Sequence, residues 1–344
     1  MESIKNRYEI MFIIEAEMCN HNGDPDMGNL PRVDEETQHG ILTDVAVKRR
    51  IRNYIQDAFE GVDGMEILMR NGTSLNRAIA EEAVPAKKET LEDNETLRVL
   101  RTQERMCLRY WDVRTFGGVL STGMNAGQVR GAVQLTLCRS ADPIHIEDMT
   151  ITRMCYTTSG GNDKVSEDVL AQLKDEEAKR ADDAKRTMGE KKIEAYGLYV
   201  VKASVSAGFA AKTGFTEADL NALFEAILQC YNHDISSSKM GMNVISPVII
   251  FKHVGTQHAN NAAEKAREAK LGCAPAHKLF DLLKVRKKED VEFPRSKGDY
   301  DISLSMDTPD GVEIGIKESP FGPVVWGKEN ILAEGIDTGC VALC

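Results

Sequence analysis

The sequence predicts an α+β fold with the element order β-α-β-β-α-β, extended by long insertions. Three features support this prediction: apolar residues alternate over 8–19, amphipathic helices are indicated over 43–61 and 216–233, and strand-like segments flank a charged stretch over 157–195. A chain of 344 residues is long enough for one large domain or two of ordinary size. Because no fixed-period repeat is visible, we expect a single domain over 1–344 with insertions.

Residues 8–19, YEIMFIIEAEMC, have the period of two that is typical of a β-strand. One face becomes acidic at Glu15 and Glu17, so the end of the strand is expected to reach solvent. The apolar face is expected to consist of Tyr8, Ile10, Phe12, Ile14, Ala16 and Met18.

The next element is a helix that begins after Thr43, a suitable N-cap, and ends before Gly61. Asp44 suits the positive end of the helix dipole. The buried stripe of this helix is expected to consist of Val47, Ile51, Ile55 and Ala58.

Between the two amphipathic helices, insertions alternate with strands. A charged helical stretch over 74–107 interrupts the apolar pattern and is predicted to be an insertion. Residues 157–195 contain few large apolar side chains and many charges of both signs, so they cannot supply a core and should project from the body. The strands expected in this part of the chain are 110–120, 133–138, 144–156 and 196–210.

The last part of the chain contains the clearest helix signal, which starts at the N-cap Thr216. A short buried strand is expected over 247–254, and a polar helix over 259–270. Alternating residues on both sides of a Pro-Asp-Gly turn predict a C-terminal β-hairpin over 296–320. The apolar stripe of the helix consists of Leu220, Leu223, Phe224, Ile227, Leu228 and Tyr231.

The sequence gives no sign of secretion, of a membrane span or of a zinc site. The start, MESIKNRYE, lacks the apolar core of a signal peptide, and the most apolar run, 244–251, is too short to cross a bilayer. We therefore expect a cytoplasmic location and no membrane partner. The eight cysteines include no C-x-x-C pair, which favours reduced thiols. The spacings of His253, His258, Cys273 and His277 match no zinc template.

The loop HNGDPDMGNLPRVD, residues 21–34, permits two interpretations. His21, Asp24 and Asp26 could hold a divalent cation for phosphodiester cleavage. Alternatively, the Asn-Gly and Asp-Pro pairs form turns, and the loop presents one basic side chain, Arg32, to a partner. We favour the second interpretation, because no second acidic cluster with ligand spacing completes a metal site.

Basic residues gather in three places although the net charge is −11. The segment KRRIR, residues 48–52, contains no acid; it is either a solvated face or a surface whose repulsion a phosphate would offset. The segment MNAGQVRG, residues 124–131, is either a turn or a loop whose backbone N–H groups and Arg130 approach a phosphodiester chain. Lys191 and Lys192 form the third group, at the base of the charged stretch.

Five stretches together resemble a known family: NGDPDMGNLPRVD, GILTDVAVKRRIRNYI, NAGQVRGAVQ, RTMGEKKIEAYGLYVVKASVSAGFAAKTGF and APAHKLFDLLKV. They are similar to the major backbone subunit of the type I-C CRISPR Cascade surveillance complex. This subunit is the seventh of the numbered CRISPR-associated families and belongs to the repeat-associated mysterious protein (RAMP) superfamily. The resemblance extends from about residue 7 to residue 285, and its motifs are long and specific.

The resemblance implies a modified ferredoxin-like palm, similar to an RNA-recognition motif (RRM-like), with inserted helical fingers and a protruding thumb hairpin. Residues 74–107 would belong to the fingers and residues 157–195 would form the thumb. Several copies would polymerise along one CRISPR RNA (crRNA) into a helical filament. Each thumb would displace one nucleotide at a regular interval and leave the other bases free to pair with target DNA.

The resemblance also implies a role in antiviral DNA interference without catalysis by this subunit, since a separate helicase-nuclease cuts the target. The expected partners are the crRNA guide, target DNA through the guide, other copies of the chain, and the other Cascade subunits. Those subunits are the pre-crRNA-processing subunit and the large and small subunits.

A subunit that binds RNA of any sequence should contact phosphates and sugars and leave base edges unread. The chain also lacks the aromatic signature of an RNA-recognition sheet. On this view the basic helix lines the palm, and Met188 is a candidate wedge at the displaced nucleotide. The candidate RNA-binding residues are Asn22, Arg32, Lys48, Arg49, Arg52, Arg114, Asn125, Gly127, Gln128, Arg130, Met188, Lys191 and Lys192.

Two other classes of function stay open. Type III backbone subunits resemble the same fold and cleave RNA with an aspartate after the first strand, a position that Asp24 and Asp26 match here. A metal-dependent ribonuclease is therefore the alternative. A metabolic enzyme with a small-molecule pocket would ignore RNA, but the sequence has no Walker, dinucleotide-binding or nucleophile-elbow motif, so no enzyme activity and no cofactor are expected.

Overall fold

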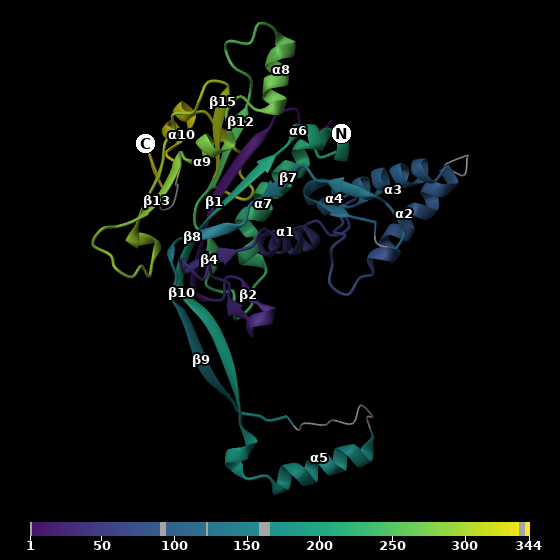
Figure 1. Ribbon diagram of the computed structural model, residues 1–344, viewed down its shortest axis with the longest axis vertical. Coiled ribbons are helices and arrows are strands. Elements are labelled where there is room, and N and C mark those ends of the chain that lie inside the picture. The colour runs from purple at the N-terminus through teal and green to yellow at the C-terminus, as the bar shows by residue number, and fades with distance from the viewer. Residues whose placement is uncertain (1, 90–93, 122, 158–165, 337–340) are drawn as a thin grey trace.

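A large antiparallel β-sheet forms the middle of a mixed α+β body (Figure 1). The computed structural model describes residues 2–89, 94–121, 123–157, 166–336 and 341–344. The strands of the sheet are β1 (Tyr8–Cys19), β4 (His39–Leu42), β7 (Val133–Leu135), β8 (Cys138–Pro143), β9 (Ile146–Arg153), β10 (Thr187–Val205), β11 (Met242–Val244), β12 (Val248–His253), β15 (Val312–Lys317) and β16 (Val325–Trp326). Their order is β16-β15-β12-β1-β10-β8-β4; β11 pairs with β1, while β7 and β9 pair with β10.

The central strand β1 is buried on both faces along most of its length. Ile10 and Phe12 pack into the core on one side of the sheet, and Met11 and Ile13 pack into the core on the other. Complete burial of such a side chain contributes about 1.5–3 kcal/mol. The prediction of one apolar face is therefore incomplete, and Met18, which was placed on that face, is exposed.

Two long helices, α1 and α7, cover one face of the sheet. Thr43 and Thr216 accept the N-cap hydrogen bonds of these two helices, as predicted. In α1, Tyr54 rather than Ala58 continues the buried stripe, and Ala58 is exposed. The helices are α1 (Asp44–Ala58), α2 (Leu75–Glu89), α3 (Glu95–Arg109), α4 (Trp111–Phe116), α5 (Glu167–Lys179), α6 (Ala207–Thr213), α7 (Glu217–His233), α8 (Ala262–Leu271), α9 (Ala276–Phe280) and α10 (Lys328–Glu334).

A second, three-stranded sheet covers the opposite face, together with α9 and α10. Its strands are β13 (Leu283–Lys287), β14 (Tyr300–Leu304) and β17 (Val341–Leu343). The prediction of a hairpin over 296–320 is wrong, because β14 pairs with β13 and β17 while β15 pairs with β12 and β16. The physical reason is burial: β15 is buried on both faces around Ile314 and Ile316 and needs a place inside the large sheet, whereas β14 keeps Asp301 exposed.

Residues 110–120 form the short helix α4 followed by strand β5 (Gly117–Val119), not the single strand that the sequence predicted. Every residue of α4 is buried, so a short apolar run gave no helical period to detect. Strand β5 pairs with β6 (Gln128–Arg130) in a separate two-stranded ribbon. A small core of its own joins α4 to α2 and α3, the two helices of the predicted insertion.

A long hairpin of β9 and the first half of β10 extends from the body and carries α5 at its far end (Figure 1). We call this segment, residues 146–194, the arm. None of the residues of α5 is buried. The structure corrects the limits of two predicted segments: residues 187–195 are part of β10 rather than of a charged excursion, and residues 207–213 are α6 rather than strand. Residues 158–165 of the excursion lie outside the described residues.

Within the described ranges, none of the helices combines the length and the apolarity that a membrane crossing requires. The seven described cysteines are all free thiols.

Gly117 is expected to be essential for the junction between α4 and β5. Its φ is +80° and its ψ is −177°, and an added Cβ would lie 2.3 Å from the carbonyl oxygen of Val129. Gly61 has a similar φ of +76° but open space around it. Gly117→Ala should therefore lower the free energy of unfolding by at least about 3 kcal/mol, and the matched control Gly61→Ala by about 1 kcal/mol. Denaturant unfolding measures both, and equal losses would contradict this account.

Candidate nucleic-acid interface

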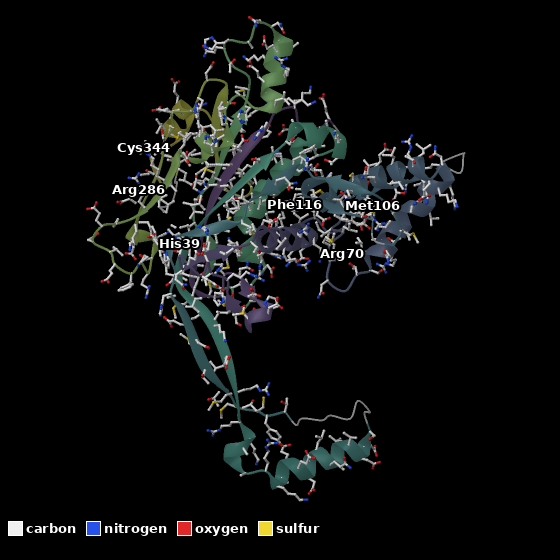
Figure 2. All side chains as sticks on the ribbon, viewed as in Figure 1. His39, Arg70, Met106, Phe116, Arg286 and Cys344 are labelled. Carbon is white, nitrogen blue, oxygen red and sulfur yellow. The ribbon has the colours of Figure 1, made fainter. Side chains whose placement is uncertain are left out.

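Two adjoining hollows, of about 610 and 370 Å³, share Arg49, Asn53 and Asp234 at the exposed face of α1. We call them together the Arg49 groove. The loop between α1 and α2, on which Figure 2 labels Arg70, contributes to one of them. The loop after β1 contributes Asn22 to the other. The basic residues that line the groove are Arg49, Arg50, Arg70, Arg77, His233 and Lys239.

The acids of the groove are already paired, and among the described residues two of its arginines, Arg49 and Arg70, have no acidic partner. Arg50 lies 2.5 Å from Asp234, and His233 lies 2.8 Å from Asp57. By contrast, in the part of the chain that the structure describes, no acid pairs with Arg49. Its guanidinium donates to the carbonyl oxygen of Met69 at 2.7 Å. Such a surface can bind an anion without first breaking an ion pair.

A buried carboxylate fixes the loop that carries Arg70. Asp112 accepts hydrogen bonds from the backbone N–H of Leu68 at 2.8 Å and of Met69 at 3.2 Å. The same carboxylate accepts from Arg52 Nε at 2.8 Å. Arg70 follows directly in the chain, so Asp112 sets its backbone position relative to α1.

Lys239 closes the other end of the groove. Its Nζ donates to the carbonyl oxygens of Asn20 and His21, each at 2.5 Å, and so joins the loop before β11 to the loop after β1. Burial lowers the pKa of the Lys239 ammonium to about 8, and nearby Arg50 adds to this effect.

The loop after β1 is built as turns, as the second interpretation of its sequence predicted. It contains β2 (Gly23–Asp24), the 3₁₀ turn η1 (Pro25–Met27) and β3 (Leu30–Pro31). Asp24 accepts from the backbone N–H of Asp26 and lies 2.8 Å from Arg32. The Asp24 carboxylate of the proposed nuclease site is thus occupied within the loop, and Arg32 is paired rather than free, whereas Asp26 is exposed.

His21 lies beneath this loop and fixes it to β10. The ring is buried, with Nδ1 3.1 Å from Glu194 Oε1. Nε2 lies 3.1 Å from the carbonyl oxygen of Arg32 and 3.2 Å from that of Ile41. Tyr199 donates its hydroxyl to Glu194 at 2.7 Å. Asn22 is also structural, since its Nδ2 donates to Thr43 Oγ1 at 2.9 Å. The sequence motif therefore builds a support for the groove.

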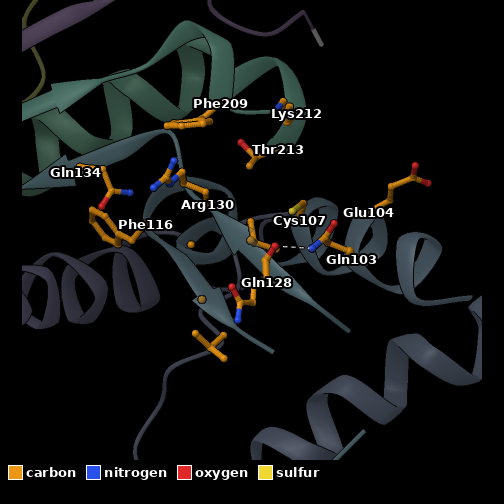
Figure 3. A pocket seen from close by; sticks show the side chains of 14 residues that line it. Gln103, Glu104, Cys107, Phe116, Gln128, Arg130, Gln134, Phe209, Lys212 and Thr213 are labelled. Atoms are coloured by element: carbon orange, nitrogen blue, oxygen red, sulfur yellow. Dashed lines mark hydrogen bonds between the residues drawn. The ribbon is translucent and has the colours of Figure 1, made fainter. Parts of the chain in front are cut away.

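A third hollow, of about 670 Å³, lies between α3, α4, the β5–β6 ribbon and α6 (Figure 3). We call it the Phe116 hollow. Lys48 and Arg52 lie against the ring of Phe116, at 5.6 and 5.1 Å from its centroid. Arg130 lies 5.1 Å from the ring centroid of Phe209. Two aromatic rings, each beside at least one cation, therefore border one space.

Lys48 and Arg52 are not the free cations that the sequence predicted. Lys48 pairs with Asp44 at 2.9 Å, and Arg52 pairs with Asp112 at 2.8 Å. Their side chains are only 12% and 13% exposed. The segment KRRIR contains no acid, but Asp44 precedes it by one helical turn and Asp112 reaches it from α4. Of the three basic residues of this helix predicted to line the palm, Arg49 alone lines the groove.

The prediction that Arg114 binds RNA is wrong. Arg114 is buried and donates two hydrogen bonds to Asp219, at 3.0 and 2.6 Å. It also donates to the carbonyl oxygen of Gly64.

The other predicted residues near β6 divide into a turn and an exposed pair. Asn125 accepts from the backbone N–H of Gly127, whose φ is +73°, so these two residues form a turn. Gln128 and Arg130 lie exposed on β6 and do line the Phe116 hollow.

The predicted residues of the arm line neither the Arg49 groove nor the Phe116 hollow. Met188 is 80% exposed on β10. Lys191 Nζ donates to the carbonyl oxygen of Ser237 at 3.3 Å. Lys192 lies 3.6 Å from Asp148 and is largely covered. The Lys191 side chain thus joins the base of the arm to the body, whereas the Lys192 side chain pairs within the arm.

Zinc ligation is also not indicated by the contacts of its candidate residues. His253 donates from Nε2 to Glu9 and accepts at Nδ1 from the backbone N–H of Cys273, so both ring nitrogens are used. Among the residues that the structure describes, no three His, Cys, Asp or Glu side chains gather into a possible metal site.

Comparison with known proteins assigns the family. The family model of CRISPR-associated protein Cas7 matches residues 6–305. The chain belongs to the Cas7 family. A curated relative, CRISPR-associated protein Cas7 of Haloferax volcanii, is 36% identical over 118 residues. That match spans 34% of this chain and only 33% of the relative.

Two solved structures are also similar to this Cas7-family chain. One, a CRISPR RNA-guided surveillance complex in a pre-nicking state, is 17% identical, with 78% of this chain and 83% of that chain covered and a TM-score of 0.43. The other, a CRISPR RNA-guided surveillance complex, is 14% identical, with 87% and 88% covered and a TM-score of 0.42.

Several lining residues of this Cas7-family chain escaped sequence analysis. They are Arg70, Arg77, Phe209, Lys212 and Lys239. Each is an isolated cation or aromatic residue in its local sequence, and only tertiary packing brings it beside α1 or β6. Phe209 and Lys212 lie within one of the stretches that carry the family resemblance, but their spacing does not mark them as lining residues, and Arg70, Arg77 and Lys239 lie in none of those stretches.

Arg114→Ala should destabilise the fold, because it leaves the buried Asp219 carboxylate without its partner. The expected loss in the free energy of unfolding is about 3–5 kcal/mol. The matched control is Arg130→Ala, which removes an exposed guanidinium and should cost less than about 1 kcal/mol. Chemical denaturation followed by circular dichroism measures both variants. Comparable stability of the two variants would contradict the structural role of Arg114.

Proposed function

We propose that this Cas7-family chain is a non-catalytic crRNA-binding backbone subunit of a type I-C Cascade surveillance complex. The observation that carries the proposal is the Arg49 groove, in which Arg49 and Arg70, which have no acidic partner among the described residues, lie beside amide and hydroxyl side chains. Guanidinium and amide donors of this kind suit phosphate oxygens and sugar hydroxyls. They give affinity for any sequence, as a guide-binding subunit requires.

The net charge of −11 is compatible with this function, because affinity for RNA depends on local cation clusters. Acids elsewhere on the chain would limit binding of unrelated nucleic acid. The ion pairs of Lys48 and Arg52 affect which residues can contact the RNA phosphates. RNA phosphates would compete there with Asp44 and Asp112, so we assign the main phosphate contacts to Arg49 and Arg70 instead.

We further propose a ferredoxin-like, RRM-like palm, with α2 and α3 as fingers and the arm as the thumb. The strand order β12-β1-β10-β8, with α1 and α7 on one face, supports this assignment. In this proposal several copies line one crRNA as a helical filament, and the exposed Met188 of the arm meets the displaced nucleotide. Other Cascade subunits and target DNA are the remaining partners, and the site of action is the cytoplasm.

The ribonuclease alternative is the weaker candidate. Its first aspartate, Asp24, is held by Arg32 and by the backbone of its own turn. His21 is buried, with Nδ1 3.1 Å from Glu194 and Nε2 within hydrogen-bond distance of two carbonyl oxygens. The loop therefore presents neither group to a phosphodiester.

Reversing two charges of the Arg49 groove tests the proposed function directly. Arg49→Glu combined with Arg70→Glu should weaken binding of single-stranded RNA on all sequences alike. The slope of log affinity against log salt should fall by about 0.7 for each phosphate that the chain no longer neutralises. Fluorescence anisotropy with labelled oligonucleotides over a salt series measures both effects.

The matched control is Arg286→Glu, a charge reversal on the exposed side of β13 (Figure 2). It should leave the affinity unchanged. A loss of affinity confined to one RNA sequence, or an equal loss of affinity in the control variant, would contradict the proposal that the groove binds phosphates.

Lys239 should make RNA binding depend on pH. Its pKa is about 8 in the free protein, and phosphates in the groove would raise it. Binding near pH 8 should therefore take up protons, and affinity should fall by up to about tenfold between about pH 7 and pH 9. Calorimetry in buffers of different ionisation enthalpy measures the uptake. Lys239→Met should abolish it, and unchanged uptake in this variant would refute the assignment.

A further inference from the structure

The Phe116 hollow has features that a phosphate-binding groove does not need. Its volume of about 670 Å³ is typical of a site for a small organic group. Gln103 Nε2 donates to the carbonyl oxygen of Gln128 at 2.8 Å, which fixes one wall (Figure 3). Gln134 lies exposed on the opposite side and donates to the carbonyl oxygen of Gly131 at 3.2 Å.

Arg130 presents a flat surface to this space. Its guanidinium lies over Phe209, 5.1 Å from the ring centroid, and Figure 3 shows the two side chains close together. Arg130 is otherwise exposed on β6. Within the described chain no acid pairs with Arg130 or with Lys212, the second cation of the hollow. A planar aromatic group can therefore pack against the exposed part of the Arg130 guanidinium, beside Phe209.

We propose that the Phe116 hollow is a nucleobase site, in which one unstacked base of the bound RNA lies against Arg130. The proposal rests on the proposed function, since the base comes from the RNA held by the chain. Nucleobases stack on guanidinium planes as well as on aromatic rings. Lys212 is placed to meet the adjoining phosphate. The amide of Gln128 is exposed and can rotate, so it suits several base edges rather than one.

This assignment explains why cations cover both rings of the hollow. A contact with a cation on one side fixes the orientation of an aromatic ring when the site is empty. The surface on which the base would lie is therefore formed before the base binds. The nucleobase site also adds a contribution from the base to the free energy of RNA binding, which otherwise comes from phosphate contacts. The base contribution and the phosphate contribution to the binding free energy can be separated by experiment.

The test compares a single-stranded oligoribonucleotide with an oligomer of the same length built from abasic residues. Phe209→Ala should weaken binding of the base-containing RNA about tenfold and leave binding of the abasic oligomer unchanged. Arg130→Lys keeps the charge but removes the planar group, so it should show the same selective loss with an unchanged salt slope. The matched control Phe321→Ala removes an exposed ring elsewhere and should change neither affinity.

The position of the base is tested by photo-crosslinking. RNA that carries 4-thiouridine should crosslink to peptides containing residues 117–119, 128–134 or 209, as mapped by mass spectrometry. Equal losses on both oligomers, or crosslinks only outside the hollow, would overturn the nucleobase site while the proposed function stands. A chain that binds neither oligomer would instead refute the proposed function and the site with it.

Discussion

The burial of β1 on both faces is the constraint on which the rest of the architecture depends. A strand with apolar side chains on both sides must have a layer above and a layer below it. Helices α1 and α7 supply one layer, and the small β13-β14-β17 sheet with α9 and α10 supplies the other. Because the layers bury the middle of β1, its polar end and the loop that follows lie at the edge of the body, where α1 begins.

The position of α1 then determines the electrostatics of the surface. One side of the helix packs on the sheet, so its cations are spread over the remaining face. Those at the flanks meet acids: Lys48 meets Asp44, Arg52 meets Asp112, and Arg50 meets Asp234. Arg49, at the middle of that face, meets only a carbonyl oxygen among the described residues. A chain of net negative charge thus keeps a local cationic groove, because its acids neutralise the cations that flank Arg49 and leave Arg49 itself without an acidic partner among the described residues.

The sequence predicted those parts of the fold that local periodicity determines. The limits of β1, the N-caps Thr43 and Thr216, and the strand over 248–253 agree with the structure. The sequence did not predict the elements whose type or strand pairing depends on burial in the folded chain. Residues 110–120 are apolar because α4 is buried all round, and the supposed C-terminal hairpin separates because β14 and β15 differ in burial. For the site, sequence analysis found Arg49 and Arg130, but not Arg70 or Phe209, which only folding brings near.

The carboxylate of Asp112 has a consequence for kinetics. It holds Leu68 and Met69 by their backbone and also holds Arg52, so the α1–α2 loop has little freedom left to lose. A polyanion that arrives meets a groove whose shape already exists, and the entropy lost on binding is that of the polymer more than that of the protein. Encounter with the groove, and not rearrangement of the loop, would then set the speed at which the complex forms.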